Sequence, residues 1–117
     1  TAQLNLAANL GPLGDLDRAV EFNRDGISTL QSLVRDFPED ARYHELCADA
    51  EINLAKTLLS QEKLADALAQ FESAERRYRR LSESHPEHPS ARASADRLTP
   101  GIQELREAVA AMAKTSM

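Results

Sequence analysis

The sequence predicts an all-α protein built from antiparallel helical hairpins that stack on one another. Three observations lead to this fold class. Apolar residues recur at spacings of three and four over most of the chain, which is the period of an amphipathic helix. No stretch shows the alternation of apolar and polar residues, bounded by turn residues, that a strand would have. The chain also nearly repeats itself after 48 residues, and such a period is typical of stacked repeat units.

The near-repeat is carried by helical residues and by the turns between them. The paired positions are Asn5-Leu6-Ala7 and Asn53-Leu54-Ala55, Leu10 and Leu58, Leu16 and Leu64, Ala19 and Ala67, Leu33 and Leu81, and Pro38-Glu39 and Pro86-Glu87. One unit of this kind cannot bury its own apolar face, so neighbouring units stack. We therefore expect a single domain over residues 1–117, divided into a first unit at about 1–38, a second at about 39–86, and a partial third unit with a C-terminal capping helix at about 87–117.

The first half of the chain predicts two helices, a short one over residues 4–10 and a long one over residues 16–37. Glycines and a proline at residues 11–14 separate them, because glycine permits a turn and proline removes a helical donor. The long helix ends at Phe37-Pro38, since the residue before proline is biased away from helical geometry. Gly26 inside it costs about 1 kcal/mol relative to alanine. We expect Gly26 to let a neighbouring helix approach closely.

The second half predicts two further helices and a C-terminal segment with two interpretations. The third helix starts after Pro38 and runs to about Ser60, and the fourth follows a short link and ends before His85-Pro86. Short connections make successive helices antiparallel neighbours. In the C-terminal segment, Thr99 and Pro100 fit the cap and first turn of a new helix. Alternatively, the segment is one helix kinked at the proline.

Composition and charge exclude several classes of function. The chain has 117 residues, enough for one compact domain, and a net charge of −5. That charge disfavours nucleic acid as a partner, because phosphates require a concentrated positive face. The sequence holds no apolar run long enough for membrane insertion. Its one cysteine, Cys47, rules out an internal disulfide, and we expect it to be a small core residue in a cytoplasmic protein.

The sequence offers little for catalysis or metal binding. It has no glycine-rich phosphate loop, no His-Glu-x-x-His, no paired-cysteine zinc pattern and no glycine-flanked serine turn. The run His85-Pro86-Glu87-His88 brings two imidazoles and a carboxylate together. Metal sites need three or four donors in fixed geometry, and the proline is already explained as the residue that ends a helix. We therefore expect no enzyme, no metal and no cofactor.

The most basic run of the chain is Arg76-Arg77-Tyr78-Arg79-Arg80, in the fourth helix. Glu72 and Glu75 precede it at spacings of three and four, which suit ion pairs along a helix. The run could contact phosphate or an acidic partner. The overall acidity favours a solvated helix face with several ion pairs instead.

The repeated residues resemble the tetratricopeptide repeat family. The family pattern runs Asn-Leu-Gly, an apolar residue, then Gly-Asp-Tyr-Asp-Glu-Ala and an aromatic. The first unit here has Asn5-Leu6-Ala7, Leu10 and then Gly14-Asp15-Leu16-Asp17-Arg18-Ala19-Val20-Glu21-Phe22. The second unit has Asn53-Leu54-Ala55, Leu58, Leu64, Ala67, Phe71 and Ala74, with Glu62 where the turn glycine would be. The resemblance covers roughly residues 1–86.

The period of 48 residues is 14 longer than the 34 that are usual in this family. Half of the excess falls between Ala19 and Pro38 and half between Pro38 and Asn53. Each half amounts to about two helical turns, so both helices of a hairpin lengthen equally and stay matched. The resemblance thus implies a long-helix variant, stacked as a short right-handed superhelix. Such repeats are similar to those appended to some bacterial signalling proteins, including kinases.

In this family the first helix of each hairpin lines a concave groove that holds a peptide or a partner helix. The resemblance places these residues on the groove: Leu4, Ala8, Arg42, Glu45, Asp49, Ile52, Lys56 and Leu59. Alternatively, the apolar members of this set pack against the adjacent hairpin. The basic clamp that holds a peptide's terminal carboxylate in some members is missing here, because Leu4 and Ala8 occupy its positions. The function implied is a protein–protein interaction or scaffold module.

Two other classes of function stay open. The first is a structural spacer or homo-oligomerisation domain of a larger bacterial signalling protein such as a kinase. It is favoured by the small number of repeats, whose ends would expose apolar surface without polar caps. Separately, the start at Thr1 rather than at an initiator methionine leads us to expect a segment of a larger protein. The second is a small helical-bundle enzyme or ligand carrier, which would require a dry apolar pocket with convergent polar groups.

Overall fold

The computed structural model describes residues 13–115, which form four helices joined by short turns. They are α2 (Leu13–Asp36), α3 (Ala41–Ser60), α4 (Leu64–Ser84) and α5 (Pro89–Thr115). The prediction of an all-α protein is confirmed for these residues. The short helix expected over residues 4–10 lies outside them. None of the described helices combines the length and apolar character that crossing a membrane requires.

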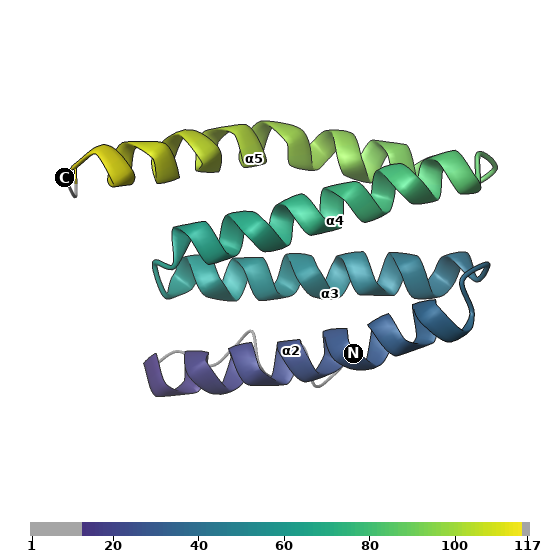
Figure 1. Ribbon diagram of the computed structural model, residues 1–117, viewed down its shortest axis with the longest axis horizontal. Coiled ribbons are helices and arrows are strands. Elements are labelled where there is room, and N and C mark those ends of the chain that lie inside the picture. The colour runs from purple at the N-terminus through teal and green to yellow at the C-terminus, as the bar shows by residue number, and fades with distance from the viewer. Residues whose placement is uncertain (1–12, 116–117) are drawn as a thin grey trace.

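The helices stack in chain order as antiparallel neighbours, as predicted. Each packs on the next, α2 on α3, α3 on α4 and α4 on α5. Figure 1 shows the α2–α3 and α4–α5 turns at one end of the molecule and the α3–α4 turn at the other. The unit boundaries expected near residues 38 and 86 both fall in turns at the first of these ends.

The apolar core is divided into two clusters, and α3 contributes to both. The first cluster joins α2, α3 and α4 and contains Ile27, Cys47, Ala50, Leu54, Leu58 and Ala67. The second joins α3, α4 and α5 and contains Ala48, Ala74, Tyr78, Leu81, Ala91 and Ala95. Alanine recurs in both because a small side chain lets helix axes approach closely at a crossing. Cys47 is fully buried, as predicted.

The α5 helix runs through Pro100 without a break, so the one-helix interpretation of the C-terminal segment is the correct one. Thr99 therefore does not cap a new helix. Its hydroxyl instead donates to Glu75 Oε2 at 2.6 Å and accepts from Arg79 Nη2 at 3.0 Å, both on α4. These bonds tie α5 to α4 directly beside the residue that removes a helical N–H.

The turn between α3 and α4 has an unusual backbone at Glu62, whose φ is 61°. This is the left-handed region, which a side chain disfavours by roughly 1–2 kcal/mol and glycine adopts freely. The Glu62 N–H donates to Leu59 O and the Lys63 N–H to Leu58 O, each at 2.9 Å. The left-handed φ of Glu62 is one that glycine adopts without strain.

We predict that Glu62→Gly raises the free energy of unfolding by about 0.5–1 kcal/mol. Glycine removes the cost of the left-handed conformation, and the gain is partly offset by the greater freedom of glycine in the unfolded chain. Urea unfolding followed by circular dichroism measures the change. Glu62→Ala is the control and should change stability little, because alanine retains the unfavourable φ. A glycine variant less stable than the alanine variant would contradict the assignment.

The expectation for Gly26 was wrong. Among the described residues, and apart from the adjoining backbone and chain neighbours in α2 itself, no atom lies within 4 Å of the position that a Cβ at Gly26 would occupy. The glycine therefore does not serve a close approach of α3 to α2. Gly26 lowers the stability of α2 at its middle, because glycine has a lower helix propensity than alanine.

Gly26→Ala should accordingly raise the free energy of unfolding by about 0.5–1 kcal/mol, the difference in helix propensity between the two residues. Thermal or urea unfolding gives the value. A loss of stability would show that the site has less room for a methyl group than its surroundings indicate.

Candidate functional site

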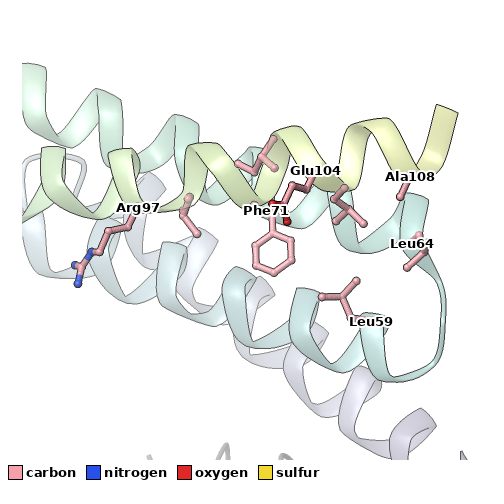
Figure 2. Close-up of a pocket in the computed structure, with 10 residues that line it drawn as sticks. Leu59, Leu64, Phe71, Arg97, Glu104 and Ala108 are labelled. Carbon is pink, nitrogen blue, oxygen red and sulfur yellow. The ribbon is translucent and has the colours of Figure 1, made fainter. Parts of the chain in front are cut away.

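An apolar groove of about 470 Å³ lies between α3, α4 and α5, near the α3–α4 turn (Figure 2). Its apolar walls are Leu59 from α3, Leu64 and Phe71 from α4, and Leu98, Ile102 and Leu105 from α5. Figure 2 shows Phe71 in the middle of this set, with Leu59 and Leu64 toward the α3–α4 turn and Arg97 at the other end. We call this the α5 groove.

The local sequence explains how the α5 groove forms. Leu98, Ile102 and Leu105 are spaced by four and three residues, so they share one face of α5. Gly101 and Ala108 lie on the same face. Because glycine has no side chain and alanine has only a methyl group, they leave space in the groove rather than fill it. Leu59 lies in the last turn of α3 and keeps 36% of its surface exposed. The groove is therefore a hydrophobic surface that the fold does not cover.

The described residues that line the α5 groove are mostly apolar. Two of them are charged, Arg97 and Glu104, both exposed on α5. Among these described residues there is no nucleophile paired with a base and no set of convergent polar groups of the kind that the carrier or enzyme alternative requires. What the groove offers is apolar area, worth about 1.5–3 kcal/mol for each large aliphatic or aromatic side chain that it buries.

Six of the eight residues expected on a groove are described by the structure, all of them on α3, and they differ in what they contact. Leu59 lines the α5 groove, whereas Ile52 is half-buried against the second core cluster. Arg42 is exposed and forms an ion pair with Asp40 at the start of α3, between Nη2 and Oδ2 at 2.8 Å. Lys56 is exposed. The expected positions Leu4 and Ala8 lie outside the described residues.

The other two expected groove residues, Glu45 and Asp49, bind neighbouring helices. Glu45 Oε2 lies 2.9 Å from Nε2 of His88, at the start of α5. Asp49 accepts a hydrogen bond from the hydroxyl of Tyr78 on α4. Burial raises the pKa of Tyr78, and the hydrogen bond to the Asp49 carboxylate raises it further. The contacts of Glu45 and Asp49 therefore connect α3 to the residue that precedes α5 and to α4.

A buried ion pair corrects the expectation for the basic run. Glu51 on α3 is only 3% exposed, and its Oε1 accepts from Arg77 Nε at 2.8 Å. Its Oε2 accepts from the Ser73 hydroxyl at 2.5 Å. Arg77 therefore does not belong to a solvated face. Arg79 does, with ion pairs to Glu75 at 3.6 Å and to an aspartate of α5 at 3.3 Å.

We predict that Arg77→Met lowers the free energy of unfolding by about 3 kcal/mol or more, because the Glu51 carboxylate would stay buried without its cation. Arg79→Met is the matched control on the same helix and should cost less than about 1 kcal/mol, since exposed ion pairs contribute little. Adding Glu51→Leu to Arg77→Met should restore most of the loss. Equal losses for the two single variants in urea unfolding would show that the pair is not specifically important.

The two histidines of the run His85-Pro86-Glu87-His88 contact different carboxylates. His88 is paired with Glu45, and His85 Nδ1 lies 3.1 Å from Glu87 Oε1. Over residues 13–115, no group of three or more His, Cys, Asp or Glu side chains is placed to hold a metal ion. Burial raises the pKa of the Cys47 thiol, which disfavours the reactive thiolate form.

Sequence reasoning missed the α4 and α5 walls of the groove. Phe71, Ile102 and Leu105 were visible as part of apolar stripes, but a stripe does not reveal which of its members are left partly uncovered.

Compared with protein-family models, with curated proteins and with solved structures, the chain gives no match.

Proposed function

We propose that this chain is a non-enzymatic interaction module whose α5 groove holds an amphipathic helix of a partner protein. The observation that carries the proposal is the groove itself, a cavity of about 470 Å³ walled by leucine, isoleucine and phenylalanine side chains of three helices. An exposed apolar concavity of this kind is typical of helix-in-groove recognition. A partly exposed leucine, Leu59, forms its rim on α3.

The dimensions of the groove favour a helix as its occupant. Along α5 the lining extends from Arg97 to Ala108, which spans roughly 16 Å or three turns at 1.5 Å per residue. A helix of matching length would present apolar residues at positions i, i+3 or i+4, and i+7. Arg97 and Glu104 carry opposite charges seven residues apart. They would favour one direction of the bound helix through complementary charges.

The resemblance to tetratricopeptide repeats supports the same location. In that family the groove is lined by the first helix of each hairpin, and α3 and α5 would be those helices in the second and third units. Leu59, which the resemblance placed on the groove, is the α3 residue that lines it. The proposal adds two residues of α4, Leu64 and Phe71, to the binding surface.

The experiment first identifies the occupant and then tests its site. A photoreactive amino acid at position 59 captures the partner, and a peptide of the crosslinked segment is then titrated against the purified chain. We expect Leu59→Asp to weaken this binding at least tenfold, because losing one buried leucine costs about 1.5–3 kcal/mol. Leu46→Asp is the control, since Leu46 is an exposed leucine on the same helix that does not line the groove.

Three kinds of result would contradict the proposed site, the helical form of the occupant, or the identity of the partner. Unchanged binding in Leu59→Asp, or equal losses in both variants, would contradict the groove as the site. A crosslinked segment that is not helical when bound, as seen by NMR, would contradict the helix. A crosslink to a second copy, with a concentration-dependent dimer in sedimentation that Leu59→Asp abolishes, would replace the partner protein with homo-oligomerisation.

A further inference from the structure

A second cavity, of about 220 Å³, lies at the opposite end of the hairpins from the α5 groove. It is formed where α2 ends, α3 begins and α4 ends. Its polar lining consists of His44 from α3, Arg77, Arg80 and Ser84 from α4, and His85 from the turn that follows. Val34, Pro38 and Leu81 form its apolar part. We call this the basic cavity.

The charge of the basic cavity contrasts with that of the whole chain. Among the described residues, its lining includes two arginines and two histidines and no carboxylate, although the chain has a net charge of −5. Glu51 binds Arg77 through Nε, and Glu87 binds His85 through Nδ1. Neither carboxylate pairs with Arg80, so the positive charge of Arg80 is not neutralised by these ion pairs.

Several hydrogen-bond donors of the basic cavity are unused. Within residues 13–115, Arg80 has no ion-pair or hydrogen-bond partner, and Arg77 uses only its Nε, which leaves both Nη nitrogens. The Ser84 hydroxyl makes no bond with the described residues, whereas the His85 ring already donates from Nδ1 to Glu87. His44 Nε2 lies 2.7 Å from the carbonyl of Pro38, which fixes its ring.

We propose that the basic cavity binds a phosphate group, either as inorganic phosphate or as a small phosphate monoester. Guanidinium groups bind phosphate oxygens through several charge-assisted hydrogen bonds. The unused donors belong to two arginines and a serine, and such a set suits a tetrahedral phosphate with three or more free oxygens better than a carboxylate with two. The basic cavity is separate from the α5 groove, so a test of phosphate binding is independent of the proposed function.

A structural role for the same residues gives a different expectation. The ends of α2 and α4 carry partial negative charge, and basic side chains near helix ends stabilise them. If the arginines served only that purpose, replacing Arg80 would lower stability and there would be no phosphate binding to lose. The matched control for the test is Arg76, an exposed arginine on the same helix that does not line the cavity.

The test is an NMR titration of the ¹⁵N-labelled chain with inorganic phosphate at constant ionic strength and pH 7. We expect saturable shifts around residues 77–85, about tenfold weaker binding in Arg80→Gln, and unchanged binding in Arg76→Gln. Acetate should bind more weakly than phosphate. A parallel titration with O-phosphoserine distinguishes the sources: tighter binding than inorganic phosphate would assign the site to monoesters, and weaker binding to the free ion.

Other results would contradict the proposal that the basic cavity binds phosphate. Shifts that do not saturate, or that weaken equally in Arg76→Gln and Arg80→Gln, would reduce the effect to general attraction of anions. Acetate binding as tightly as phosphate would remove the preference for a tetrahedral anion. Urea unfolding of Arg80→Gln that shows lost stability, with phosphate shifts unchanged, would assign Arg80 to the helix end alone.

Discussion

The rest of the structure depends on the burial of α3 between its neighbours. This helix lies between α2 and α4 and supplies buried residues to both core clusters. Small side chains at these contacts, such as Cys47, Ala48 and Ala50, permit the close packing. The helices gain little stability as isolated segments, and most of it comes from burying their apolar faces against one another. The described fold is thus organised around one central helix.

Polar contacts from α3 add specificity to this packing. Glu51 binds Arg77 and Ser73 on α4, and Asp49 binds Tyr78 on the same helix. Apolar side chains tolerate a helix sliding or rotating by a small amount, whereas a buried carboxylate is costly in any arrangement that loses its cation. These pairs favour one register of α4 against α3. Because α4 carries walls of both cavities, that register also positions Phe71 in one and Arg80 in the other.

The two cavities differ in chemistry because they are built at opposite ends of the hairpins. At the α3–α4 end the lining is mostly aliphatic and aromatic. At the other end, arginine and histidine side chains gather beside the helix ends. The four helices of the described residues thus form two separate cavities, since the two sets of lining residues share no member.

Local sequence patterns were enough to predict the all-α fold and the stacked hairpins of the described residues, the turns near residues 38 and 86, and the burial of Cys47. These depend on helical periodicity and on proline and glycine, which are local properties of the chain. The sequence could not decide whether Pro100 breaks a helix, because contacts of Thr99 with α4 hold the helix there. It did not identify the burial of Glu51, the room around Gly26, or which apolar residues stay uncovered at Leu59 and Phe71. Those were decided by the tertiary structure, because each depends on the side chains that a neighbouring helix brings to the site.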